Sequence, residues 1–211
     1  MSPKLTDQRK ERRNLQILDA AKRVFAEKGY GAATLQDIIE ETGMSRGWIY
    51  LYYKSKDEIF EILLDHLDAE HERHLKELTE SSASVWETVA ALYSEQLEEL
   101  LHSSHGGLFS AFYEYFMIGW RDETRRGTLL KRYEKGISRF ANLLEAGVER
   151  GEFSPVTDIA HVARLAASFQ EGIMTHSIAV GPDKADARMQ FDALLRYLKS
   201  LLQPGCDQNR I

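Results

Sequence analysis

Apolar residues recur at three- and four-residue spacing along nearly the whole chain, and alternating, strand-like runs are scarce. Proline lacks a backbone N–H and breaks helix interiors, so its positions mark where helices end. All four prolines fall at expected segment boundaries: Pro3, Pro155, Pro182 and Pro204. The sequence therefore predicts an all-α fold of about eight or nine helices. The 211 residues suffice for one large domain or two modest ones.

Charge is distributed unevenly along the chain. The net charge is −6, but residues 1–56 carry eleven Lys or Arg against seven Asp or Glu, a balance of +4, and the remainder carries −10. A cation close to a DNA backbone gains free energy by releasing counterions. A basic N-terminal segment on an acidic body therefore favours DNA binding through that segment alone. Chance variation of surface charge is the alternative interpretation of this asymmetry taken by itself.

Three helices with very short connections are expected near the N-terminus. The first covers about residues 12–28, and Gly29 ends it. A capping box at its start and Gly43 at its end delimit the second, over about residues 34–43. The third begins after Ser45 and continues to about residue 52.

A fourth, long helix opens at the capping box Ser55-Lys56-Asp57-Glu58 and leads out of this group. We expect a helix-turn-helix domain with a basic N-terminal arm over residues 1–56. A helical effector-binding and dimerisation domain is expected over 57–204. A flexible tail is expected over 205–211, and it contains Cys206, which has no second cysteine to pair with.

The two short helices and the tight turn at Gly43-Met44 have the geometry that places a second helix in the DNA major groove. Arg46, near the start of that helix, can donate two hydrogen bonds to guanine. Gly47 leaves the backbone free to approach the duplex, and Tyr50 presents a ring and a hydroxyl one turn later. Short or cationic donors around the rim are expected to hold phosphates: Thr34, Ser45, Tyr52, Lys54 and Lys56.

About fifteen positions carry a resemblance to a known family. In order and spacing they resemble the DNA-binding signature of the TetR family of bacterial regulators. The resemblance covers the first quarter of the chain in detail, whereas the later helices agree only in number and length. The matching residues are Ile17-Leu18-x-Ala20-Ala21-x-x-x-Phe25-x-x-x-Gly29-Tyr30, Thr34-x-x-x-Ile38 and Gly43-x-Ser45-x-Gly47-x-Ile49-Tyr50-x-Tyr52-Tyr53-x-x-Lys56-x-x-Ile59.

The resemblance implies a ligand-responsive transcription regulator with an effector pocket in its second domain, and repression is the family default. It implies base reading by Arg46, Gly47 and Tyr50. It also implies phosphate contacts from Thr34, Ser45, Trp48, Tyr52 and Lys56. Trp48 stands at a position that varies in the family.

The second domain contains a dense aromatic stretch over residues 108–133. Small-molecule sites in helical bundles form between facing helices, so these side chains predict a pocket for an apolar or aromatic effector. A filled aromatic core is the alternative for any single residue. The candidate pocket walls are Phe112, Phe116, Trp120, Tyr133, Phe140, Phe169 and Met174.

The last two helices are expected to form a homodimer interface. Small residues permit close approach of one helix, and a long apolar stripe marks the other: Ala163, Ala167 and Gly172, then Phe191, Leu194, Leu198 and Leu201. Two-fold symmetry sets the two recognition helices about 34 Å apart, so the operator is expected to be a near-palindrome. An effector that binds better when the two recognition helices are wrongly spaced for the operator lowers the affinity for DNA. The coupling free energy between two such sites is typically about 1–3 kcal/mol.

Two local patterns in the sequence could indicate other functions. Gly43-Met44-Ser45-Arg46-Gly47 matches the Gly-x-Ser-x-Gly pattern of serine hydrolases, but an amphipathic helix precedes it instead of the required buried strand. His71 and His74 share a helix face, yet a solvated surface explains them better than a metal site. We therefore expect no enzymatic activity, metal or cofactor. The alternatives are a helical adaptor without DNA binding and an all-helical enzyme that uses the aromatic cavity.

The cellular location follows from what the sequence lacks. No segment reaches the roughly 20 apolar residues that a membrane-spanning helix needs, and the polar, basic start has no apolar signal core. We expect a cytoplasmic protein whose partners are double-stranded DNA, a small effector and a second copy of the chain.

Overall fold

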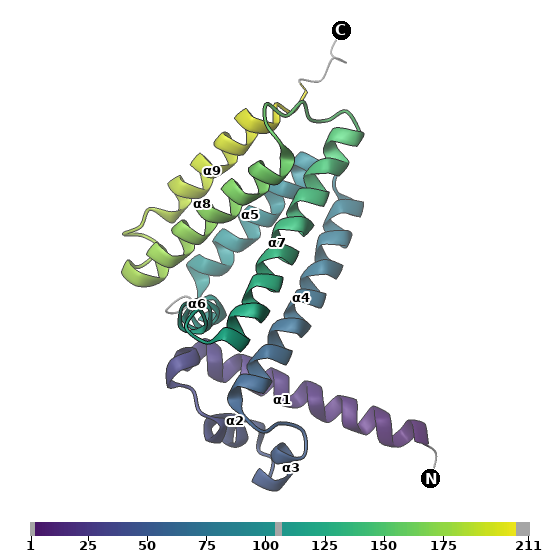
Figure 1. Cartoon of the computed structure of the whole chain (residues 1–211), viewed down its shortest axis with the longest axis vertical. Coiled ribbons are helices and arrows are strands. Elements are labelled where there is room, and N and C mark those ends of the chain that lie inside the picture. Colours follow the sequence, from purple (N-terminus) through teal and green to yellow (C-terminus); the bar gives the residue numbers. More distant parts are fainter. Residues whose placement is uncertain (1–2, 104–106, 206–211) are drawn as a thin grey trace. The chain divides into compact units, whose positions relative to one another are not determined.

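The computed structural model describes residues 3–103 and 107–205, and within them it leaves the side chains of residues 3–7 and 124 undescribed. The described residues form nine α-helices in two compact units, Met1–Arg73 with Ser104–Tyr115, and His74–Ser103 with Phe116–Ile211. In chain order the helices are α1 Pro3–Ala32, α2 Leu35–Thr42, α3 Arg46–Tyr50, α4 Lys56–Ser81, α5 Val85–His102, α6 Gly107–Gly119, α7 Glu123–Glu149, α8 Ile159–Val180 and α9 Ala187–Leu202 (Figure 1).

The first unit is built around an aromatic cluster. Phe25 of α1 and Phe60 of α4 meet edge to face at 4.6 Å between ring centroids, and Tyr30 lies 4.9 Å from Phe60. Tyr115 of α6 completes the cluster, fully buried at 5.0 Å from Phe60. Aromatic rings in this range of distances attract each other beyond the effect of burial alone. The first half of α6 is therefore part of the core of the N-terminal unit.

The helix-turn-helix is fixed by local capping. The hydroxyl of Thr34 accepts from the N–H of Asp37 at 3.1 Å, and the Asp37 carboxylate accepts from the N–H of Thr34 at 2.8 Å. Gly43 ends α2 in the left-handed region, with φ of 65°. These observations confirm the capping box and the glycine stop expected from the sequence.

The second unit is a helical bundle in which α7 packs on α8, α8 on α9, and α5 on both α7 and α9 (Figure 1). Its core contains the fully buried Leu144, Leu194 and Leu198. The segment after α7 is tied to the end of α9, because Ser154 and Val156 donate backbone hydrogen bonds to Leu202 and Leu201.

Several bounds differ from those expected. The first helix is longer than residues 12–28, because it begins at Pro3 and continues through a kink at Gly29. Asp158 caps α8 by accepting hydrogen bonds from the N–H groups of Ala160 and His161. The first unit reaches Arg73 instead of ending at residue 56, because α4 contributes buried side chains to its core.

Two further expectations concern the C-terminal tail and the possibility of a membrane-spanning helix. The expected tail over 205–211, with Cys206, lies outside the described residues except for Gly205. Across the described ranges, every helix is too short or too polar to cross a bilayer.

Candidate DNA-binding interface

Helix α3 carries the residues expected to read DNA bases. Arg46 is exposed and Tyr50, one turn later, is 44% exposed. Their side chains touch each other: the Arg46 guanidinium donates to the Tyr50 hydroxyl at 3.3 Å and lies 5.4 Å from the centre of its ring. Ile49 is fully buried and anchors the helix to the unit. The predicted pair therefore forms one polar group on the solvent side of α3.

Successive residues of a helix are about 100° apart, so buried Ile49 fixes the direction of every other α3 side chain. Gly47 lies on the opposite side, at the most outward point of α3, and a Cβ added to it meets nothing within 4 Å. Arg46 and Tyr50 lie on one flank of this point and Trp48, 43% exposed, lies on the other. This order suits insertion into a groove, with a bare backbone at the centre and larger side chains towards the two walls.

The residues expected to contact phosphates differ in their placement. Ser45 precedes α3 and makes no capping hydrogen bond with its side chain, and Lys54 is exposed after the helix. Tyr52 is half-buried. The hydroxyl of Thr34, although exposed, donates to Asp37 at 2.8 Å and accepts from its N–H. Ser45 and Lys54 therefore have side chains available for DNA, whereas Thr34 is occupied in capping α2.

Lys56 differs most from the expectation. Its ammonium group donates to the carbonyl oxygens of Tyr30 at 2.7 Å, Gly31 at 3.2 Å and Ala33 at 2.7 Å. The last carbonyls of a helix have no partner within it, and a lysine can satisfy them. Three acceptors occupy the three N–H groups of Lys56, so this residue caps the end of α1, and a phosphate contact would have to replace one of these hydrogen bonds.

The turn between α1 and α2 is held by side chains that no local sequence pattern marks. The Tyr30 hydroxyl donates to Asp57 of α4 at 2.5 Å, and the Gly31 N–H donates to Glu114 of α6 at 2.7 Å. Because 83 residues separate Gly31 from Glu114, no helical spacing or short motif could have revealed this contact.

Asp37 and its partner Lys28 have shifted pKa values, and so does Tyr53. The hydrogen bond to Asp37 raises the pKa of Lys28. The hydrogen bond from Lys28, together with hydrogen bonds from Thr34, lowers the pKa of Asp37 to about 2. Burial raises the pKa of Tyr53 to about 12. Asp37 is therefore ionised and Tyr53 is neutral at physiological pH.

The residues expected to line an effector pocket do not form one group. Met174 is fully buried, and Phe140 is half-buried at 6.1 Å from the ring of Tyr93. Three others lie on the surface of the single chain instead of in its interior: Trp120 is 59% exposed, Tyr133 40% and Phe169 49%. The remaining two, Phe112 and Phe116, are half-buried at the point of α6 where the chain passes from one unit to the other.

The residues expected at the dimer interface are mostly internal. Ala163, Phe191, Leu194 and Leu198 are buried in the protomer, so these four are not available to a second copy. Ala167, Gly172 and Leu201 are half-buried. The apolar stripe of α9 packs inward against α8 and α5, which explains the difference.

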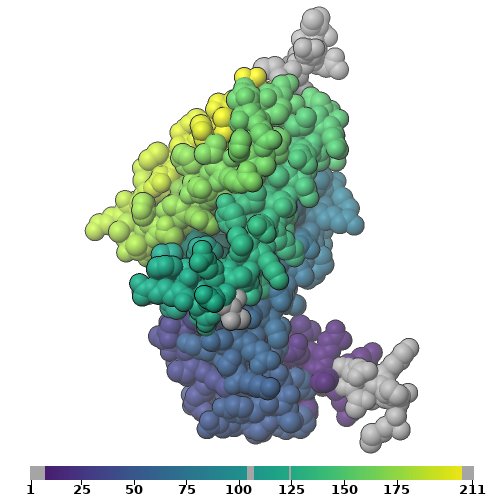
Figure 2. Space-filling model, viewed as in Figure 1, coloured from purple at the N-terminus to yellow at the C-terminus, as the bar shows by residue number. Residues whose placement is uncertain are grey.

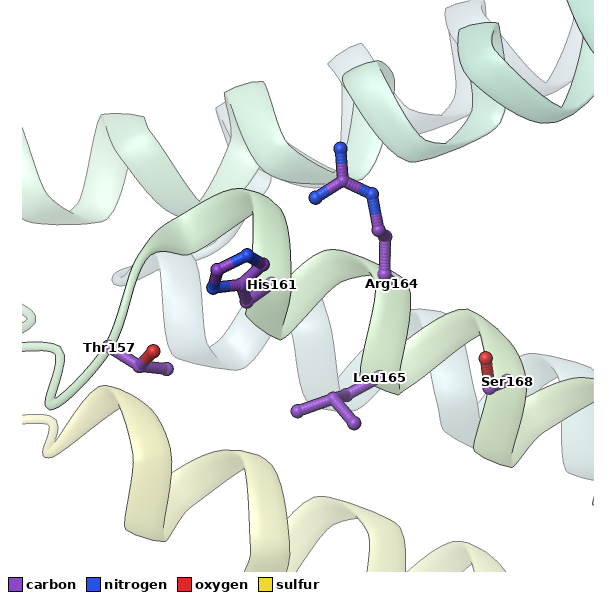
Figure 3. A pocket seen from close by; sticks show the side chains of 5 residues that line it. All are labelled: Thr157, His161, Arg164, Leu165 and Ser168. Atoms are coloured by element: carbon purple, nitrogen blue, oxygen red, sulfur yellow. The ribbon is translucent and has the colours of Figure 1, made fainter.

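The outward side of α8 carries the exposed apolar side chains Leu165 and Phe169, and Phe169 lies 5.5 Å from Tyr197 of α9. An open groove of about 440 Å³ follows the first turns of this helix, and Figure 3 shows the residues that line it. They are Thr157, His161, Arg164, Leu165 and Ser168.

The residues that could indicate a serine hydrolase or a metal site are not arranged for either function in the described part of the chain. Ser45 lies between two helices, so the strand-to-helix turn of a serine hydrolase is not formed there. His74 pairs with Glu95 at 2.7 Å. Over the described ranges, no three His, Cys, Asp or Glu side chains come together in a way that could hold a metal ion.

Comparisons with known proteins agree over both units. Residues 17–63 match the family model of bacterial regulatory proteins, tetR family, and residues 90–188 match the model of the tetracyclin repressor-like C-terminal domain. The HTH-type transcriptional regulator YfiR of Bacillus subtilis (strain 168) is 37% identical over 203 residues, which cover 96% of this chain and 98% of the relative.

More distant relatives also match over most of the chain. The HTH-type transcriptional repressor KstR2 of Mycolicibacterium smegmatis is 27% identical over 173 residues, 78% of either chain. Among solved structures, the regulator FadR of Bacillus subtilis in complex with stearoyl-CoA has a TM-score of 0.66 at 23% identity. That match covers 89% of this chain and 98% of the other, and it shows a shared fold.

Proposed function

This chain belongs to the tetR family of bacterial regulatory proteins, and we propose that it represses transcription by binding DNA through α3 until a small-molecule effector releases it. The proposal of DNA binding rests on how the side chains of α3 are arranged. The joined pair Arg46 and Tyr50 faces solvent beside the bare backbone of Gly47, while Ile49 anchors the helix from behind. An arginine so placed can donate two hydrogen bonds to a guanine edge.

The direct test begins with selection of bound fragments from genomic DNA by the purified full-length protein. Arg46→Ala is expected to lower affinity for the selected fragment by about 10- to 100-fold, since a bidentate base contact is worth about 1–3 kcal/mol. Lys184→Ala changes an exposed charge in the turn before α9 and is the matched control. If Arg46→Ala binds like the control, with circular dichroism unchanged, α3 does not read the bases.

We further infer that the chain acts as a homodimer through the outward sides of α8 and α9. Leu165, Phe169 and Tyr197 supply exposed apolar surface there, and half-buried Ala167 and Gly172 allow a second helix to approach closely. A two-fold axis through such an interface repeats α3 on both sides, which requires a near-palindromic operator with half-sites about 34 Å apart.

Light scattering of the purified protein tests this assembly. Phe169→Glu is expected to shift the mass from dimer to monomer, because it buries a charge against an apolar partner. Val148→Glu is the control, since Val148 is also partly exposed but belongs to α7, which is not one of the two helices of the proposed interface. A monomeric wild type, or a dimer that survives Phe169→Glu, contradicts the proposal.

The effector is proposed to be apolar or aromatic and to bind inside the second unit. Met174 is buried in this unit, and the ring of Tyr93 neighbours those of Phe140 and Phe191, so these side chains are apolar candidates for the walls of a ligand site. The fold neighbour FadR was solved with stearoyl-CoA, so acyl thioesters are rational first probes alongside planar aromatics. A ligand that raises the melting temperature and lowers DNA affinity supports the assignment, and a broad screen that changes neither removes it.

Two helices belong to both units and offer routes for the signal. α4 passes from the first unit to the second after Arg73, and α6 does so after Tyr115. An effector that stabilises a shifted position of either helix lowers DNA affinity by its differential binding free energy. A regulator of this kind needs no enzymatic activity and acts in the cytoplasm, where its operator is.

A further inference from the structure

Arg13 of α1 lies over the indole ring of Trp48 on α3. The central carbon of the guanidinium is 4.0 Å from the ring centroid. A cation over an aromatic face is attracted by the electron density of the ring, and tryptophan is the strongest partner for it. Among the described residues, no carboxylate forms an ion pair with Arg13, so Trp48 is the contact that orients this side chain.

The backbone around Arg13 is fixed on both sides. Ile17, one turn later in α1, is fully buried in the first unit. Asn14, the next residue, accepts a hydrogen bond from the hydroxyl of Tyr53, which is itself buried just beyond α3. Two adjacent residues of α1 thus hold the segment that contains α3, Asn14 through Tyr53 and Arg13 through Trp48.

On the basis of the proposed DNA binding by α3, we propose that Arg13 positions Trp48 for DNA contact and itself binds a backbone phosphate beside it. Stacking uses the flat face of the guanidinium and leaves its N–H groups in the plane for another acceptor. The indole is 43% exposed, so it keeps apolar surface for a sugar or a thymine methyl.

The position of the pair on α3 supports this role. Trp48 occupies the flank opposite Arg46 and Tyr50, as its spacing from buried Ile49 requires. In a major groove about 12 Å wide, the two flanks of an inserted helix face the two sugar-phosphate walls. Arg13 therefore supplies a cation to the wall that Arg46 does not reach. Towards its N-terminus, α1 extends outward from the rest of the first unit (Figures 1 and 2). Exposed Arg9 and Arg12 on this helix add further cations.

The positioning role is tested first without DNA. Trp86→Phe with Trp120→Phe leaves Trp48 as the one fluorescent tryptophan of the full-length chain. Arg13→Gln is expected to increase both acrylamide quenching of Trp48 and its local motion, because the stacked cation no longer covers one face. Arg12→Gln removes a neighbouring exposed arginine and is the matched control. Equal quenching in both variants would overturn the positioning role.

The DNA contact is tested by a double-mutant cycle on the fragment selected by the wild type. Arg13→Gln and Trp48→Leu are each expected to weaken binding, and together by about 3- to 30-fold less than the product of their separate effects, as a cation–π pair predicts. Arg13→Gln is also expected to reduce the slope of log affinity against log salt by about 1, and Arg13→Lys to restore that slope but not the coupling.

The outcomes separate this inference from the function on which it rests. A wild type that selects no DNA overturns the proposed function. A wild type that binds DNA, with additive effects of the two substitutions and an unchanged salt slope in Arg13→Gln, overturns only the role of Arg13.

Discussion

The carboxylate of Glu114 accepts a hydrogen bond from the backbone N–H of Gly31 at 2.7 Å and joins α6 to the turn that precedes the helix-turn-helix. Tyr115, the next residue, is fully buried beside Tyr30 and Phe60 and donates to Glu61 of α4 at 2.6 Å. Two consecutive residues of α6 therefore fix it to the DNA-binding unit, one to the backbone of a turn and one in the aromatic core.

Removing the Glu114 carboxylate is expected to loosen this turn. Glu114→Ala deletes a charge-assisted hydrogen bond, worth about 1–3 kcal/mol, and is expected to speed hydrogen exchange of the Gly31 amide and to weaken DNA binding. Glu114→Gln keeps an acceptor without the charge and is expected to be intermediate. Exchange at Gly31 that is the same in all three proteins would mean that the bond does not restrain the turn.

A side chain at position 29 is expected to be poorly tolerated. Gly29 has φ of 74° and ψ of 170°, a conformation open almost only to glycine, and an added Cβ lies 2.4 Å from Oε1 of Glu114. Gly29→Ala is expected to cost about 1–3 kcal/mol from the backbone alone. Chemical denaturation measures this cost. The variant Gly29→Ala with Glu114→Ala separates the two causes, because only the steric part is relieved.

Lys54 and Lys56 are expected to behave differently although both are cations near α3. Lys56→Met removes three hydrogen bonds to the end of α1 and is expected to lower the stability of the protein, with little change in the salt dependence of DNA binding. Lys54→Met is expected to leave the melting temperature unchanged and to reduce the salt slope by about 1. If Lys56→Met instead left the melting temperature unchanged and reduced the salt slope, Lys56 would be a phosphate contact.

The helix-turn-helix could be predicted because its determinants are local. The Thr34 capping box and the left-handed Gly43 act within three or four residues, so their spacing in the sequence specifies their geometry. Lys56 could not be assigned in this way. Its carbonyl partners lie 23 to 26 residues earlier, and a cation beside a DNA-binding helix resembles a phosphate contact until those partners are known.

The residues expected at a dimer interface show a second limit of sequence spacing. Phe191, Leu194 and Leu198 form the strongest apolar stripe of α9, and the strongest stripe is buried in the protomer's own core. An interface on the outward sides of α8 and α9 needs only a smaller apolar surface, such as that of Phe169 and Tyr197. A surface of this size gives a weaker periodic pattern in the sequence than the core does. Sequence spacing finds the apolar side of a helix, but it does not distinguish the core from a partner.

Acid is expected to remove a stabilising interaction from the first unit. The bonds from Lys28 and Thr34 lower the pKa of Asp37 to about 2, from near 4 in an unfolded chain. The ionised form is favoured in the folded state, so this contribution is complete above about pH 4 and is lost as the pH falls towards 2. Urea denaturation of wild type and Asp37→Asn is expected to show a difference at pH 6 that shrinks over this range. Asp192→Asn removes an exposed carboxylate of α9 and is the matched control, and an equal trend in both variants would show that the loss does not come from Asp37.

A substitution at Gly47, the most outward residue of α3, is expected to weaken DNA binding without lowering the stability of the fold. A Cβ at Gly47 meets no atom within 4 Å beyond its chain neighbours and the backbone of its own helix, and alanine favours a helix over glycine by about 1 kcal/mol. Gly47→Ala is therefore expected to keep or raise the melting temperature. Its methyl group would separate the backbone of α3 from the base edges, so operator affinity is expected to fall by about tenfold or more, for a lost contact of about 1–3 kcal/mol. Gly136→Ala on α7, also with open space at its Cβ, should gain similar stability and bind DNA normally. Equal DNA affinity of the two variants would show that Gly47 does not face the duplex.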